Sequence, residues 1–404
     1  FFGPEKLSFE CRRDNLEDFP DETFAEDRRL ELRTIPQDEE MLMEIARDTW
    51  KYFEAARDRQ THLVVDHLKT DDTPLAADYT SITNIAMDLL ATVAAMDLEF
   101  ISKGEARKRV REVFKTLKTM SRYEGFFYNF YNTHTLQVSR QYVSTVDSGW
   151  LAVALVVMRQ AFGGSIASQA TDFMDEFDFE KLLDLENNQF LIGFEIPYRE
   201  VKNHHYGMLV SEARATSFYA IGKGDVPQHH WWFLFRTAPE VWNWQNQKPR
   251  GHYEVQDGVD YFQGHYEYLG QKFVPSWGGS LFEFLMPTLV MKERELAPEG
   301  LGKNNRVAAE LHRDYALKEK GYPVWGISPA ATLDGRGWRY SEYGISQLAV
   351  KGYPDEGVIA PYVSFLALDA LPADSLLNIR RLLGYRLYGP YGFYDSLDIK
   401  TGMA

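Results

Sequence analysis

The chain has 404 residues, 45% of them hydrophobic and 25% charged, and a formal net charge of −15 at pH 7. This composition indicates a folded globular protein and excludes a disordered one, and the negative charge argues against nucleic acid as a partner. The longest apolar run, residues 151–158, is about half the length of a membrane helix, so we expect no membrane span. The single cysteine, Cys11, excludes an internal disulfide and a cysteine-based metal site.

The chain is predicted to begin with an arm and to continue as one helical domain. Residues 1–36 carry mixed charges and no clear period, which predicts an extended arm before a domain over residues 37–404. From residue 38 the apolar side chains recur at helical spacing. Helices are predicted over residues 38–58, 80–100, 104–122, 145–162, 207–222, 280–291, 304–320 and 359–387. Long aromatic, glycine-rich loops are expected over residues 123–143, 186–206, 223–279 and 321–358.

Helical hairpins joined by long loops predict an all-α fold. The simplest form is an (α/α)6 toroid in which the aromatic loops form a glycan cleft at one end. Such a toroid needs about twelve helices, and about ten are found in the sequence. We therefore expect one terminal helical hairpin to be missing, and the open ring to be covered by the N-terminal arm, by further residues or by a second copy in a homo-oligomer.

Glu212 is the first candidate catalytic acid. It lies in HHYGMLVSEARATSF, where apolar neighbours predict a buried helix face that Glu212 would share with Thr216 and Tyr219. Apolar surroundings raise the pKa of a carboxyl group, which a general acid needs. The alternative is an ordinary surface ion pair with Arg214 or Lys223.

Other acids lie among aromatic residues. Asp147 follows Ser144 at capping-box spacing, so the residues alone leave it either a helix cap or a site residue. Glu283 lies in SLFEFLMP, Glu342 in YSEYG and Asp395 in LYGPYGFYDSLD. Most tryptophans follow residue 230; flat rings suit sugar faces, although core packing explains any single one equally well.

Other chemistries lack their motifs. The adjacent pairs His204–His205 and His229–His230 do not converge on one metal ion from a regular helix or strand. Neither a phosphate-binding loop nor a Gly-x-Ser-x-Gly elbow occurs. We therefore predict no metal and no cofactor, and we expect carboxylates in an aromatic cleft to act on a polysaccharide or oligosaccharide.

Seven stretches, in order over roughly residues 38–400, together resemble the glycoamylase-like family. That family includes bacterial endo-β-1,2-glucanases and the cyclising domain of cyclic β-1,2-glucan synthases. The stretches are TSITNIAMDLLATVAAMDLEFIS, GFFYNFYNTHTL, YVSTVDSGWLAVAL, LVSEARATSFYAIGKGDVPQHHW, SWGGSLFEFLMPTLV, VWGIS and YGFYDSLD.

The resemblance implies a toroid that hydrolyses or transfers β-1,2-linked glucan. It implies that Glu212 is the general acid and that Asp395 is the general base of an inverting reaction, with Glu283 as the next candidate catalytic acid. It also assigns further residues to the substrate cleft. These are Tyr128, Asn132, Asp147, Trp150, His205, Tyr206, Arg214, Trp231, Trp277, Trp325, Tyr343 and Tyr391.

The sequence departs from the family at two acids. Asn132 and Pro329 stand where the family often has carboxylates, which leaves the linkage open. Three alternatives to an inverting, endo-acting β-1,2-glucanase therefore remain: a retaining transglycosylase with Glu283 as nucleophile, a glycan-binding toroid without catalysis, and a polysaccharide lyase. The compartment is open, with a periplasmic or secreted location slightly preferred over the cytoplasm.

Overall fold

The computed structural model describes residues 38–402 except 71–74, 197–199, 202–203 and 335–336. The expected N-terminal arm, with Cys11, lies outside the described residues. The helices are α1 (Asp38–Ala55), α2 (Ile82–Asp97), α3 (Lys103–Leu117), α4 (Thr145–Phe162), α5 (Gly164–Glu176), α6 (Arg214–Lys223), α7 (His230–Phe233), α8 (Leu281–Leu285), α9 (Glu293–Leu296), α10 (Leu301–Asp314), α11 (Tyr362–Leu366) and α12 (Pro372–Leu383).

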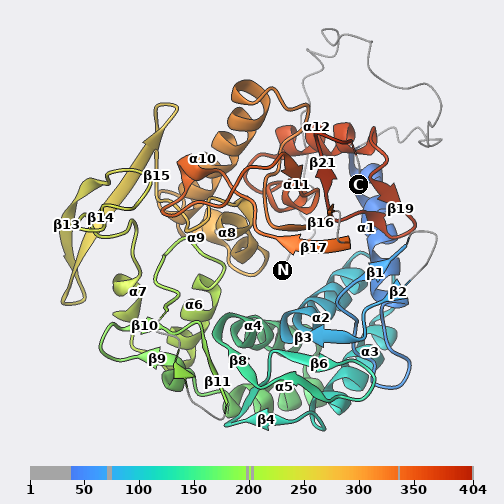
Figure 1. The fold of residues 1–404 in the computed structure, drawn as a ribbon. Helices are drawn as coiled ribbons and strands as arrows, with labels where there is room; N and C mark the ends of the chain where they lie inside the picture. Colours follow the sequence, from blue (N-terminus) through green and yellow to red (C-terminus); the bar gives the residue numbers. More distant parts are fainter. Residues whose placement is uncertain (1–37, 71–74, 197–199, 202–203, 335–336, 403–404) are drawn as a thin grey trace.

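The helices follow one another around a ring, from α1 through α6 and α10 to α12 (Figure 1). Its first and last helices meet. Met41 and Ile45 of α1 are buried with Ile379 of α12 in one apolar cluster. Arg380 pairs with Asp38, and the Tyr388 hydroxyl donates to Asp48 Oδ2 at 2.9 Å. The apolar faces of α1 and α12 are therefore covered by each other.

Serine caps set the start of several helices. Ser81, Ser102 and Ser144 each accept a hydrogen bond from a backbone N–H in the first turn of α2, α3 and α4, satisfying a donor that has no partner within the helix. Helix α4 ends at Gly163 with φ 63°, a conformation that glycine adopts at little cost. These local signals explain why α4 has the predicted bounds.

The fold is not all-α, as the sequence predicted, because short strands in nine small sheets occupy the connections. The strands are β1 (Leu68–Lys69), β2 (Leu75–Ala76), β3 (Tyr79–Ser81), β4 (Arg122–Tyr123), β5 (Phe126–Phe127), β6 (Phe130–Asn132), β7 (Val138–Arg140), β8 (Tyr142–Ser144), β9 (Leu183–Asp184), β10 (Gln189–Phe190), β11 (Gly193–Glu195), β12 (Glu200–Val201), β13 (Arg250–Gln256), β14 (Val259–Tyr268), β15 (Gln271–Phe273), β16 (Ala330–Asp334), β17 (Gly337–Ser341), β18 (Val358–Ile359), β19 (Tyr388–Gly389), β20 (Gly392–Phe393) and β21 (Leu397–Asp398).

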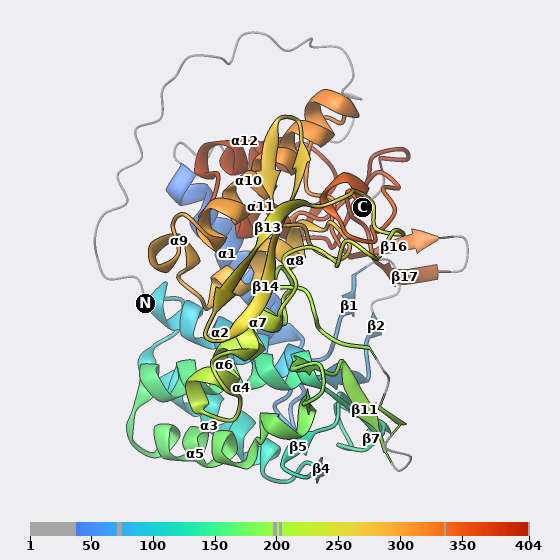
Figure 2. The same cartoon turned by 90° about the vertical axis from the view of Figure 1, so that its left-hand side faces the viewer.

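Several of these strands gather at one end of the ring. In Figure 2, β7, β11, β16 and β17 lie to the right, whereas α1, α5 and α9 lie to the left. Each sheet is antiparallel, and β8 pairs with β11 so that Val143 faces Phe194 across the ladder. The loop end of the ring is thus built from strands that lead directly into helices, as β3 leads into α2 and β8 into α4.

Three predicted segments differ from the structure. Helix α5 was not predicted, although Ile166, Ala170 and Phe173 recur at helical spacing and are buried. The helix predicted over residues 207–222 begins only at Arg214, so Glu212 lies in the turn before α6. The expected loop 223–279 contains the long β13–β14 hairpin, in which Arg250–Gln256 pair with Val259–His265.

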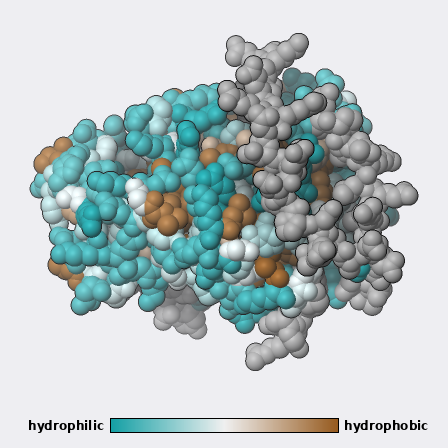
Figure 3. Space-filling view, turned by 90° about the horizontal axis from the view of Figure 1, so that it is seen from above, coloured by the Kyte–Doolittle hydropathy of each residue, from teal (hydrophilic) through white to brown (hydrophobic). Residues whose placement is uncertain are grey.

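Two large apolar clusters form the interior. The first lies among α2–α5 and includes Phe114, Leu151 and Phe173; the second joins α8, α10 and α11 and includes Phe284, Leu311 and Trp325. The face seen in Figure 3 is mostly hydrophilic, with separate hydrophobic patches. Among the described helices, none is both long and apolar enough to span a bilayer.

Candidate active site

Glu212 is a half-buried carboxyl group with little hydrogen bonding. Of the contacts recorded for its carboxylate, one is a long hydrogen bond from Ser211 Oγ at 3.4 Å. Burial raises the pKa of Glu212 to about 7, and the negative charges of Glu283 and, less strongly, Asp147 act in the same direction. Desolvation and like charges both disfavour the ionised form. Glu212 therefore holds its proton at near-neutral pH, as a general acid requires.

Asp147 lies at the start of α4, but its carboxylate is not occupied with the cap. The Ser144 hydroxyl accepts from the Asp147 N–H, whereas the Asp147 carboxylate accepts from Thr83 Oγ1 at 2.5 Å. With its amide nitrogen facing Asp147, Asn129 also donates to both carboxylate oxygens at 3.2 and 3.3 Å. Burial raises the pKa of Asp147 against these hydrogen bonds. The acid thus faces α2 and the loop before β6.

Glu283 is a buried acid whose carboxylate is fully engaged. In the capping box of α8 it accepts from the N–H and the hydroxyl of Ser280, and it also accepts from Ser276 Oγ and from the Gly278 N–H at 2.9 Å. Burial raises its pKa, whereas these four donors favour the ionised form. A carboxylate held by four donors is suited to fixing the loop 276–280 in place.

Asp395 lies between β20 and β21 and joins the C-terminal segment to β16. Its carboxylate accepts from the Ala331 N–H, and the adjacent Ser396 hydroxyl donates to the Ala331 carbonyl at 2.6 Å. Part of Asp395 is exposed, yet the surrounding protein raises its pKa, helped by the negative charge of Asp66. A group that water reaches while protein surrounds it lines a recess rather than a convex surface.

Shared tyrosine neighbours bring these acids into one region. Burial, followed by the charges of Glu283, Glu342 and Glu212, raises the pKa of Tyr353. Burial and the charges of Glu212 and Asp147 likewise raise the pKa of Tyr206 well above its usual value. The Tyr362 phenol, which donates to the Pro329 carbonyl at 3.0 Å, is near the charges of both Asp395 and Glu283. Candidate acids far apart in sequence thus act on the same phenols.

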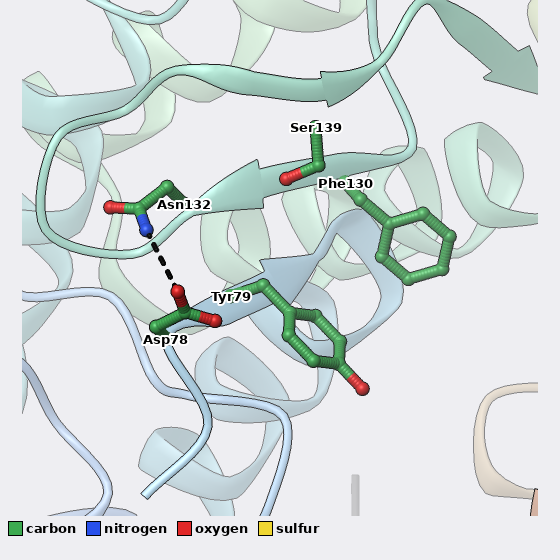
Figure 4. Close-up of a pocket in the computed structure, with 5 residues that line it drawn as sticks. All are labelled: Asp78, Tyr79, Phe130, Asn132 and Ser139. Carbon is green, nitrogen blue, oxygen red and sulfur yellow. Dashed lines mark hydrogen bonds between the residues drawn. The ribbon is translucent and has the colours of Figure 1, made fainter.

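A pocket of about 360 Å³ lies between β3 and β6 (Figure 4). It is lined by Asp78, Tyr79, Phe130, Asn132 and Ser139, and the Asn132 amide donates to Asp78 at 3.4 Å. The rings of Tyr79 and Phe130 are 6.0 Å apart and extend in the same direction. An open pocket with two rings and polar edges has the chemistry of a sugar-binding surface.

Asp66 connects this pocket with the C-terminal acid. Its carboxylate accepts from the Tyr79 hydroxyl at 3.1 Å and from the Asn84 amide at 2.8 Å. Its charge also acts on Asp395. The pocket and Asp395 are therefore neighbours, although they come from opposite ends of the chain.

Four residues assigned to the substrate cleft are buried instead. Trp150 is 2% exposed and Trp325 1%, and both belong to the apolar clusters; Tyr343 and Arg214 are equally inaccessible. Arg214 donates to Glu293 rather than extending to a ligand. In this structure these side chains support the site from behind. The assignment of direct sugar contact was wrong for them because aromatic residues and arginine also stabilise interiors.

The other predicted residues have accessible surface. Tyr128, Asn132, His205, Tyr206, Trp231 and Tyr391 are half-buried, and Trp277 is 40% exposed. Asn132 lines the pocket of Figure 4, and His205 Nε2 lies 2.8 Å from Asp184 Oδ2. Within the ranges that the structure describes, no three His, Cys, Asp or Glu side chains are grouped as a metal site requires.

The sequence analysis missed several residues of this region. Asp66, Asn129, Thr83 and Tyr353 contact or influence the candidate acids, but none was proposed. The stretch TSITN contains Thr83 and Asn84, and NFYN contains Asn129, so the matching stretches carried part of this signal. Asp66 and Tyr353 lie outside all seven stretches and had no local motif.

Comparisons with known proteins agree with this architecture. Residues 205–403 match the family described as "Putative glucoamylase", and residues 44–220 match one described as "Protein of unknown function (DUF3131)". The "Cyclic beta-(1,2)-glucan synthase NdvB" of Rhizobium meliloti (strain 1021) is 25% identical over 497 aligned positions. That match covers 89% of this chain but 16% of the relative, so the chain spans about a sixth of that protein's length.

Solved structures share the fold. The endo-β-1,2-glucanase from Chitinophaga pinensis superposes with a TM-score of 0.66 at 14% identity, covering 91% of this chain and 88% of that one. The β-1,2-glucanase from Parabacteroides distasonis gives 0.69 at 16% identity, covering 91% and 54%. The fold and the site thus define a glycoamylase-like protein with several acids at the loop end of a helical ring. The chain belongs to the glycoamylase-like family, as its seven stretches predicted.

Proposed function

We propose that this chain is a glycoside hydrolase that cleaves β-1,2-linked glucan within the chain, with inversion at the anomeric carbon. The observation that carries the proposal is Glu212, a half-buried carboxyl group whose pKa lies at about 7 beside two other acids. The named activities of the relatives, a cyclic β-1,2-glucan synthase and two β-1,2-glucanases, support glucan as the substrate class.

In the proposed reaction Glu212 donates its proton to the glycosidic oxygen as the bond to the anomeric carbon breaks. Asp395 accepts a proton from water, directly or through a substrate hydroxyl, while that water attacks the anomeric carbon from the opposite face. The leaving sugar takes the Glu212 proton, and Asp395 holds the proton from water, so proton exchange with solvent restores both acids. Inverting pairs are roughly 6.5–9.5 Å apart, which leaves room for water.

A second candidate is a retaining transglycosylase in which Glu283 attacks the anomeric carbon. The effect of Glu283 on Glu212 favours it, because a nucleophile must lie close to the acid, at about 5–5.5 Å. The four donors that engage the Glu283 carboxylate oppose it, since those hydrogen bonds reduce its nucleophilicity. A glycan-binding ring without catalysis is the third candidate, motivated by Asn132 and Pro329.

The test is incubation with linear β-1,2-glucan, with α-1,4- and β-1,3-glucans as controls, followed by separation of products by size and anomer. We expect oligosaccharides with inverted anomeric configuration from β-1,2-glucan alone. Glu212→Gln should lower turnover by roughly 10²–10⁴-fold, and the matched Glu299→Gln, at an 88% exposed side chain, should not. Retained configuration would favour the transglycosylase, and binding without products would favour the inactive ring.

A further inference from the structure

Three tryptophans next to the acid cluster expose their rings to solvent. Trp242 is 37% exposed, Trp244 45% and Trp277 40%, and we call this group the tryptophan platform. The rings of Trp242 and Trp244 stack at 5.5 Å, and those of Trp244 and Trp277 meet edge to face at 5.9 Å. Indole rings carry a large apolar area, so three of them on one surface require an explanation beyond ordinary exposure.

The platform is held rigidly by side-chain amides. The Asn246 amide donates to the carbonyls of Ser346 and Lys351 at 2.9 and 3.2 Å, and the Gln247 amide donates to the Gln347 carbonyl. These contacts tie the loop that carries Trp242 and Trp244 to residues 346–351. A surface fixed before binding loses little entropy when a ligand arrives.

The same segment connects the platform with the candidate acids. The Trp277 carbonyl accepts from the N–H groups of Lys351 and Gly352 at 3.0 Å, and the next residue, Gly278, donates to Glu283. Tyr353 packs so closely on Gly278 that an added Cβ would lie 1.9 Å from its ring. The charges of Glu283 and Glu212 act on that Tyr353 phenol. The platform is therefore the outward continuation of the proposed site.

We infer that the tryptophan platform is a distal binding surface for a neutral glucan chain whose other end occupies the site at Glu212. The inference rests on the proposed function. Sugar rings present C–H faces to indoles while their hydroxyls reach a polar rim, here the Lys351 ammonium, 5.7 Å from the Trp244 ring. Continuity with the acids favours a glucan over a protein partner as the occupant.

The test uses the Glu212→Gln chain as a non-hydrolysing background and measures binding by titration calorimetry and tryptophan fluorescence. The ligands are a long linear β-1,2-glucan fraction and the β-1,2-linked disaccharide. Adding Trp242→Ala and Trp244→Ala together should weaken binding of the long chain roughly tenfold, because each lost ring contact costs a few-fold, and should leave disaccharide binding unchanged. Trp244→Ala alone should give a smaller loss in the same direction.

The matched control is Val241→Ala, because Val241 is 84% exposed on the same loop and carries no ring. Equal binding of the long chain with and without the two indoles would overturn the platform while leaving the proposed function intact. Equal loss for both ligands would overturn it too, because the effect would then belong to the central site. If the Glu212→Gln background binds neither ligand, the proposed function itself fails.

Discussion

Arg214 and Glu293 form a buried, two-pronged ion pair behind the turn that carries Glu212. Arg214 Nε and Nη2 donate to the two carboxylate oxygens of Glu293 at 2.7 and 2.9 Å, and the side chains are 0% and 3% exposed. Arg214 Nη1 also donates to the carbonyls of Ser211 and Glu283, both at 3.0 Å. One guanidinium group thus fastens the segment around Glu212 to α8 and α9.

Removing only the acid of this pair should destabilise the fold strongly. Glu293→Ala leaves the Arg214 charge buried without its partner, which typically costs about 3–5 kcal/mol. Urea unfolding should show this loss at constant m-value. The exposed pair Arg306–Glu310 is the matched control, and Arg306→Ala should cost less than about 1 kcal/mol. A double replacement, Arg214→Met with Glu293→Leu, should be less destabilising than Glu293→Ala alone; a larger loss would show that the charges themselves are required.

The local signals in the sequence predicted most of the helical ring. Ser144 and Gly163 bound α4 where the apolar period begins and ends, and the prediction had the same limits. The β13–β14 hairpin was missed although its turn, Asp257–Gly258, is a strong hairpin signal with alternating residues on either side. Both residues have positive φ, at 51° and 78°. A clear local pattern was thus overlooked there.

The site was harder to predict because it depends on distant pairs. Glu212 could be named from its apolar neighbours, but its position in a turn depends on Arg214 reaching carbonyls of α8. The same arginine looked like a ligand contact until its acid, 79 residues away, was located. Spacing within one stretch carries no information on which residue of another stretch will be its partner.

Close packing of α4 against α6 should make Gly149 intolerant of a larger residue. A Cβ at Gly149 would lie 1.9 Å from Thr216 Oγ1, and Thr216 is fully buried. Gly149→Ala should therefore destabilise by about 1–3 kcal/mol, as overpacking does, in chemical denaturation. Gly104→Ala in α3 is the control: its nearest listed contact would be 3.7 Å away, and helix propensity predicts a gain of roughly 0.5–1 kcal/mol. Equal effects at the two positions would contradict the packing explanation.

Glu212 should reduce stability at alkaline pH. Its pKa is raised to about 7 in the folded chain, so the native state binds this proton more tightly than the unfolded state does. Between the two pKa values stability then falls as pH rises. Glu212→Gln removes the buried charge and should raise the free energy of unfolding by about 1–3 kcal/mol at pH 8 but not at pH 4. Denaturant curves at both pH values measure this.

The exposed Glu299→Gln is again the control, with no difference expected between the two pH values. If Glu212→Gln left the unfolding free energy unchanged at pH 8, the raised pKa of Glu212 would be disproved. Loss of activity in the same variant would then need another cause, such as a positional role for the carboxylate.

Glu283 offers the sharpest separation between the inverting and the retaining reaction. Its negative charge is the largest electrostatic contribution that raises the pKa of Glu212 after burial. Glu283→Gln removes that charge, so the pKa of Glu212 should fall. Because Glu212 must be protonated to act as the acid, the alkaline limb of kcat/KM should move to lower pH, while measurable turnover remains at the acidic end. The retaining reaction predicts instead that turnover is lost at every pH, since no nucleophile is left. A pH–rate profile of kcat/KM on β-1,2-glucan, with the melting temperature recorded for each variant, measures both outcomes. Glu342→Gln is a useful comparison, because Glu342 is exposed and its charge acts on Tyr353 but not measurably on Glu212; its alkaline limb should stay in place, and a shift as large as that of Glu283→Gln would show that the effect is not specific to Glu283.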